Sequence, residues 1–119
     1  MSNEDYLHHR EKPLRLKNKK GEILYPNPSD IYKVSKGNDK LLYHSDYDGI
    51  LTDPDSLRTG IIFLEQFGFH HTHHVNLLNI NRPDAKFDGK RVYFRNGDYG
   101  RITDQYLQYL KKIGFFKKK

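Results

Sequence analysis

The chain has 119 residues, and its 21 Lys and Arg against 15 Asp and Glu give a formal net charge of +6 with neutral histidines. A chain of this length buries one hydrophobic core, so we expect a single domain over residues 1–119. It contains no cysteine, which excludes disulfides, thiolate metal ligands and a cysteine nucleophile. No run of about 18 apolar residues is present to span a membrane. The polar start lacks the apolar stretch of a signal peptide, which favours a cytoplasmic protein.

The first half of the chain predicts a meander of short antiparallel strands. Residues 1–11 are polar and show no periodic pattern, which predicts a mobile arm. The segments "LRLK" and "EILY" predict a hairpin whose turn contains Gly21, and "IYKVS" and "KLLYHS" predict a second hairpin. The segment "YDGIL" predicts one more short strand.

A helix is predicted over "SLRTGIIFLEQF". Four apolar residues recur there at helical spacing, which predicts one buried helix face: Leu57, Ile61, Leu64 and Phe67. Gly68 stands where a helix C-cap adopts a left-handed conformation.

The second half predicts further strands and a terminal helix. The segments "HVNLLNI" and "RVYFRN" read as strands, and "DQYLQYLKKI" reads as a helix that begins at Thr103 or Asp104 and ends at Gly114. Residues 117–119 form a basic tail. The expected fold is α+β, with an N-terminal meander of short antiparallel strands, a helix, further antiparallel strands and a C-terminal helix packed on the sheet.

Three segments resemble a known group of proteins: "LRLKN" at 14–18, "KV" at 33–34 and "IIFLEQFGF" at 61–69. The group consists of small uncharacterised proteins from phages and mobile elements of Bacteroidetes-type bacteria, which carry "LRIGN" and "PIPLTEEILxKxGF" segments. The resemblance implies a phage or mobile-element protein in the cytoplasm of a bacterial host, such as an anti-defence accessory protein. It implies no biochemical activity.

Four of the seven histidines fall within "HHTHH" at 70–74. On one continuous strand His71 and His73 share a face, and His70 and Thr72 share the other. Two histidines at this spacing need a third protein ligand to hold a metal, and the sequence pairs none with them. We therefore expect no metal and no cofactor.

The triplet from His70 to Thr72 has the H-x-T form that two-histidine phosphodiesterases use twice. A single copy supplies only half of the acid and base pair that such a reaction needs. A small His-dependent phosphodiesterase therefore stays open as an alternative, and no catalytic residue is predicted.

The segment "KRVYFRN" places Arg91, Tyr93 and Arg95 on one strand face. Guanidinium groups beside a phenol are suited to binding phosphate while an aromatic ring stacks on a base. Together with nearby histidines and a later arginine, this gives the predicted ligand-binding set: His71, His73, Arg91, Tyr93, Arg95 and Arg101.

The positive charge and this residue set predict a non-enzymatic protein that binds a phosphate-bearing anion, either nucleic acid or a nucleotide signal. The main alternative is a protein-protein inhibitor or assembly component that binds a host protein through tyrosine-rich surface. Self-association into a homo-oligomer is left open.

Overall fold

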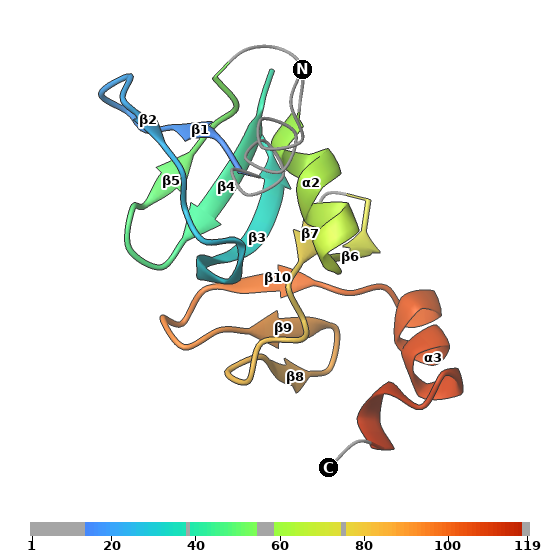
Figure 1. Cartoon of the computed structure of the whole chain (residues 1–119). Helices are drawn as coiled ribbons and strands as arrows, with labels where there is room; N and C mark the ends of the chain where they lie inside the picture. Colours follow the sequence, from blue (N-terminus) through green and yellow to red (C-terminus); the bar gives the residue numbers. More distant parts are fainter. Residues whose placement is uncertain (1–13, 38, 55–58, 75, 118–119) are drawn as a thin grey trace, which may run out of the picture.

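The computed structural model describes residues 14–37, 39–54, 59–74 and 76–117 (Figure 1). The predicted arm and the last two residues of the basic tail lie outside these ranges. The described chain forms three antiparallel sheets with helices α2 and α3 beside them, which confirms the predicted α+β fold. None of the described helices has the length and apolar character needed to cross a membrane.

The N-terminal hairpin forms as predicted. Strands β1 (Leu16–Lys17) and β2 (Ile23–Leu24) pair antiparallel, and Gly21 in their turn has a φ of 86°. Two backbone hydrogen bonds then join Lys17 to Thr52, beside the next sheet, at 2.7 and 2.9 Å.

The largest sheet has five strands in the order β5-β4-β3-β7-β6. Its strands are β3 (Ile31–Lys36), β4 (Leu41–Ser45), β5 (Ile50–Leu51), β6 (His70–His73) and β7 (Asn76–Leu78). A 3-10 helix, η1 (Pro28–Asp30), precedes β3. The second predicted hairpin is therefore confirmed as β3 and β4, and the short strand expected in "YDGIL" is β5.

The histidine run does not continue as one strand. The chain reverses after β6, so that β6 and β7 pair antiparallel with His73 opposite Asn76 and His70 opposite Leu78. The strand predicted in "HVNLLNI" is therefore confirmed as β7, but the alternation expected to run on from the histidines is wrong, because the register shifts within β6 and the chain reverses before β7. Strand β7 pairs with both β3 and β6 and buries Leu77, and β6 forms one edge of the sheet.

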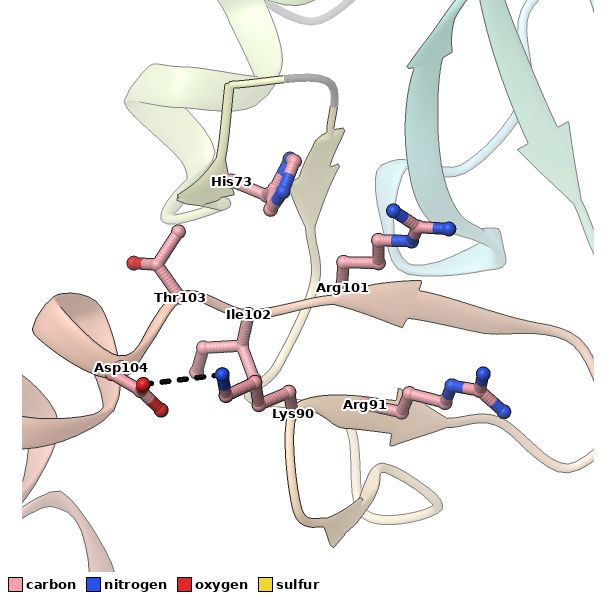
Figure 2. A pocket seen from close by; sticks show the side chains of 7 residues that line it. All are labelled: His73, Lys90, Arg91, Arg101, Ile102, Thr103 and Asp104. Atoms are coloured by element: carbon pink, nitrogen blue, oxygen red, sulfur yellow. Dashed lines mark ion pairs between the residues drawn. The ribbon is translucent and has the colours of Figure 1, made fainter.

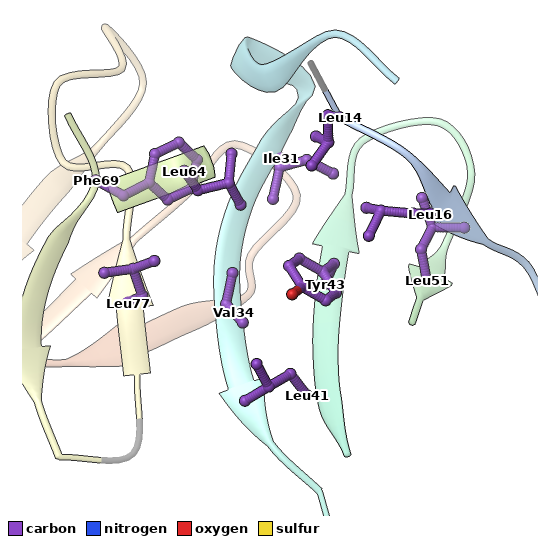
Figure 3. Packing of buried hydrophobic residues seen from close by; sticks show 10 residues of the cluster. All are labelled: Leu14, Leu16, Ile31, Val34, Leu41, Tyr43, Leu51, Leu64, Phe69 and Leu77. Atoms are coloured by element: carbon purple, nitrogen blue, oxygen red, sulfur yellow. The ribbon is translucent and has the colours of Figure 1, made fainter. Parts of the chain in front are cut away.

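One face of the five-stranded sheet forms the first core with helix α2 (Thr59–Phe67) (Figure 3). Tyr43 lies in the middle of this face and is fully buried. A Cβ at Gly60 would lie 2.8 Å from the Tyr43 hydroxyl, so the absence of a side chain lets the helix approach the ring. The hydroxyl donates to Asp53 Oδ2 at 2.7 Å, and Asp53 Oδ1 accepts from the Gly60 amide at 3.0 Å.

The predicted buried face of this helix is partly wrong. Leu64 is fully buried, but Phe67 is 50% exposed. The chain turns at Gly68, whose φ is 110°, and Phe69 instead of Phe67 packs into the core. Leu57, the first residue of the predicted face, lies outside the described residues.

The three-stranded sheet, called the small sheet below, holds β8 (Lys86–Asp88), β9 (Arg91–Tyr93) and β10 (Tyr99–Arg101) in the order β10-β9-β8. Helix α3 (Asp104–Lys112) follows, with Thr103 as N-cap accepting from the Tyr106 amide at 3.1 Å, and η2 (Phe115–Lys117) ends the described chain. This sheet and helix enclose a second core built on Tyr32, Leu78, Ile80, Val92, Phe94, Ile102 and Leu110.

The two larger sheets approach closely at Gly100. A Cβ there would lie 2.2 Å from Leu78 Cδ2, closer than any side chain tolerates. Beside this contact, Asp98 accepts from Lys33 Nζ at 3.0 Å and from the Tyr32 hydroxyl at 2.8 Å. Lys33 also donates to the carbonyl of Tyr99 at 2.9 Å. The five-stranded sheet is therefore joined to β10 by the packing of Leu78 from β7 and by the charge of Lys33 from β3.

His44 lies within this polar contact. Its Nε2 is 2.8 Å from Ser35 Oγ and its Nδ1 is 3.7 Å from Asp98 Oδ2. Burial and, to a smaller extent, the Lys33 charge lower the pKa of His44 to about 4, against the opposing effect of the Asp98 charge. The imidazole is therefore neutral at pH 7.

Stability should depend on pH through His44. In the unfolded chain His44 takes up a proton near pH 6.5, and in the folded chain only near pH 4. The stability that depends on neutral His44 is therefore fully present above pH 6.5 and is lost as pH falls from 6.5 to 4. The free energy of unfolding should fall by about 3 kcal/mol over this window. Urea unfolding of the parent chain and of His44→Gln at several pH values measures it.

The variant should show a shallower pH dependence, with contributions remaining from His70 and His73, whose pKa values burial also lowers. Equal slopes for the parent chain and His44→Gln would contradict the assignment.

Candidate functional site

Arg91 and Arg101 are both exposed and are direct cross-strand partners on β9 and β10. In Figure 2 their side chains extend from the neighbouring strands in the same direction. They line a hollow of about 390 Å³ whose other lining residues are His73, Lys90, Ile102, Thr103 and Asp104. Three of the predicted ligand residues, His73, Arg91 and Arg101, therefore meet at one place.

Hydrogen bonds from the hairpin of β6 and β7, which we call the histidine hairpin, hold β10 in position. The carbonyl of Arg101 accepts from Thr72 Oγ1 at 2.7 Å and from Asn76 Nδ2 at 2.9 Å. The Thr103 amide then donates to the carbonyl of Thr72 at 2.9 Å. The place of Arg101 is therefore set by residues on two other strands.

Tyr93 lies beside Arg91 on the exposed face of the small sheet. Arg91 Nη1 is 3.3 Å from the Tyr93 hydroxyl, and its guanidinium carbon lies 4.7 Å from the centre of the Tyr99 ring. The Tyr93 and Tyr99 rings are 5.5 Å apart and tilted by 41°. Alternation along β10 places Tyr99 and Arg101 on the same face, a signal that was present in "YGR" but was not used in the sequence prediction.

His73 adds a titratable group to this hollow. Burial lowers its pKa, and the nearby charges of His74 and Arg101 lower it further. The His73 and His74 rings stack with centres 4.2 Å apart. Protonation of His73 is thus opposed by the positive charge around it, and an anion placed there would favour it.

His71 is not part of this hollow. Its Nε2 forms a hydrogen bond with Glu65 of α2, and the side chain lines a separate hollow with Lys36, Leu41 and His74. The structure therefore does not bring His71 and His73 to one site, because His71 bonds to the helix while His73, at the end of β6, reaches the hollow beside β10.

Arg95 is also placed elsewhere. It follows β9 in the turn to β10, where its amide donates to Asp84 Oδ2 at 2.8 Å and its guanidinium lies 3.9 Å from Asp46. Asp46 and Asp84 both bind the nearly buried Arg82 as well. Arg95 therefore faces an acidic cluster and contributes little to an anion site at Arg91.

The hollow has one charge pair of its own. Lys90 Nζ lies 3.2 Å from Asp104 Oδ2, and both side chains are 69% exposed (Figure 2). An ion pair this exposed contributes little free energy and is easily opened by a competing anion. Lys90 and Thr103 were missed in the sequence prediction, because they enter the hollow through the pairing of β9 with β10.

The H-x-T side chains are used for packing. His70 Nδ1 lies 2.5 Å from the Tyr106 hydroxyl of α3, and the Thr72 hydroxyl is bound to Arg101 and 1% exposed. These contacts hold β6 against α3 and β10 and leave Thr72 out of reach of a substrate.

Ser35, His44 and Asp98 have the residue types of a hydrolase triad but not its chemistry. The His44 to Asp98 distance of 3.7 Å is too long for a hydrogen bond, and Lys33 and Tyr32 already occupy the carboxylate. Because burial lowers the pKa of His44 to about 4, the ring is a weak base. Within the described ranges no three His, Cys, Asp or Glu side chains are grouped to hold a metal.

No family model matches the chain, and no curated protein matches it. The chain is similar in structure to a domain from Bacillus cereus, described as the LytTr DNA-binding domain of a methyl-accepting/DNA response regulator. The TM-score is 0.63 at 18% identity, and the match covers 83% of this chain and 93% of that one. The likeness shows a common fold. The resemblance to phage and mobile-element proteins stays a prediction.

Proposed function

We propose that this protein binds nucleic acid through the basic hollow between β6, β9 and β10. Duplex DNA is the first ligand to test. The observation that carries the proposal is the convergence of Arg91, Arg101 and His73 on one exposed hollow from three different strands. Guanidinium and imidazole groups in such an arrangement can each bind a phosphate oxygen.

The fold supports the same proposal. The similar Bacillus cereus domain is described as DNA-binding and shares most of its length with this chain. The net charge of +6 favours a polyanion, because each neutralised phosphate releases condensed counterions. A phage or mobile-element setting, including an anti-defence role, remains a proposal that rests on the sequence resemblance.

Nucleic acid is favoured over a single nucleotide because the hollow is open and extended. Arg91, Tyr93 and Tyr99 continue it along the exposed face of the small sheet, so successive groups of a polymer can be contacted. The hollow has one acidic side chain, Asp104, and the neighbouring charge of Lys90 offsets it.

Removing the two arginines should weaken binding in a salt-dependent way. For Arg91→Gln/Arg101→Gln, the slope of log K against log salt should become shallower by roughly two, since about 0.9 is lost for each phosphate contact. Fluorescence anisotropy with a labelled duplex at about 50 to 200 mM salt measures this slope.

Lys111→Gln/Lys112→Gln is the matched control, because it removes the same charge from exposed positions on α3. Arg95→Gln should also have little effect, although the sequence predicted it as a ligand residue. Equal losses in the double arginine variant and the lysine control would refute the assignment of the hollow.

Binding should strengthen on acidification because His73 lines the hollow. Its pKa is lowered in the free protein by burial and then by His74 and Arg101, and a bound phosphate should raise it. Binding then takes up a proton, so affinity rises as pH falls through the ordinary histidine range, by at most about tenfold per pH unit for this group. The same anisotropy titration across pH measures it.

His73→Gln should flatten this dependence, while His71→Gln should not, because His71 is bound to Glu65 outside the hollow. Circular dichroism at each pH checks that the variants stay folded. A pH dependence that His73→Gln leaves unchanged would contradict the role of this histidine.

A further inference from the structure

A second basic hollow lies at the N-terminal hairpin, away from the residues described above. It measures about 400 Å³ and brings together three lysines, Lys17, Lys19 and Lys40, from the hairpin and from the turn before β4. Leu42 and Ile50 provide apolar parts of its lining. We call this group of three lysines the lysine cradle. It shares no residue with the hollow at Arg91 and Arg101.

The charged side chains that line the cradle are all positive, and an adjoining hollow that shares Lys19 also holds Asp48. The lining of the cradle itself contains no acidic side chain, and none of the three lysines takes part in an ion pair among the described residues. The carboxylate of Glu22, in the same hairpin, accepts from Asn18 Nδ2 at 2.8 Å. The three ammonium groups therefore repel one another, and a bound anion would relieve that repulsion.

The backbone beneath the cradle is held by several hydrogen bonds. Asn18 Oδ1 accepts from the amides of Lys20 at 3.0 Å and Glu22 at 2.9 Å, which fixes the turn of the hairpin. The paired backbone bonds between Lys17 and Thr52 fix the base of the hairpin beside β5. The carbonyl of Lys40 accepts from the Gly37 amide at 2.8 Å. The lysines are therefore carried by ordered segments, which reduces the entropy lost when they bind.

We propose that the lysine cradle is a second phosphate-binding site, which takes phosphate groups of the nucleic acid backbone or of a free nucleotide. Lysine ammonium groups act as point charges that bind phosphate without reading a base, so the site adds affinity and no sequence preference. Where the phosphate belongs to nucleic acid, the inference rests on the proposed function. Binding of a free phosphate chain does not depend on it.

The first arm of the test compares Lys17→Gln/Lys19→Gln/Lys40→Gln with Lys86→Gln/Lys111→Gln/Lys112→Gln, which removes the same charge from exposed positions outside both hollows. On duplex DNA, the slope of log K against log salt should become shallower by roughly two to three in the cradle variant and by less than one in the control. Equal slopes in the two variants would overturn a nucleic-acid contact at the cradle.

The second arm titrates the full chain with sodium tripolyphosphate and with a nucleoside triphosphate, followed by amide NMR shifts. The cradle predicts shifts at residues 17–21 and 52 that persist in Arg91→Gln/Arg101→Gln and disappear in the cradle variant. Such shifts without any DNA binding would uphold the cradle as a site for free phosphates and reject the proposed function. DNA binding that is lost only with the arginines, with no shifts at 17–21, would reject the cradle and keep the proposed function.

Discussion

The carboxylate of Asp98 joins the two larger sheets, and the position of the candidate site depends on it. One oxygen accepts from Lys33 Nζ at 3.0 Å and from the amide of Tyr99 at 2.8 Å, and the other accepts from the Tyr32 hydroxyl at 2.8 Å. Burial alone would raise the pKa of Asp98, but the bonds from Lys33 and Tyr32 outweigh it and hold the pKa below its usual value. The group is thus ionised at neutral pH, where it binds β3 to the start of β10.

From this junction the chain builds the site by short steps. Asp98 is followed by Tyr99, Gly100 and Arg101, so the residue that allows close packing on Leu78 lies between two residues of the exposed face. The histidine hairpin then binds the far end of β10 through the carbonyl of Arg101. Packing on the buried face of β10 therefore fixes the position of Arg101 on the exposed face.

Local patterns in the sequence predicted most of the elements, because hairpins and caps are set by neighbouring residues. The turn at Gly21, the cap at Thr103 and the strand containing Arg91 were all predicted correctly. Long-range pairing decided the rest. The register shift within β6 interrupts the alternation that would have kept His71 and His73 on one face, the acidic cluster at Asp46 drew Arg95 away, and Lys90 joined the site only through strand pairing.

Duplex DNA affinity of Asp98→Asn tests the account most directly, because charge and geometry predict opposite results. The substitution removes a negative charge and so, by charge alone, would strengthen binding to a polyanion. If Asp98 positions Tyr99 and Arg101 as described, affinity should instead fall, in a protein whose circular dichroism shows that it is folded at the temperature of measurement. An affinity that is unchanged or higher would contradict the dependence of the site on the junction between the sheets.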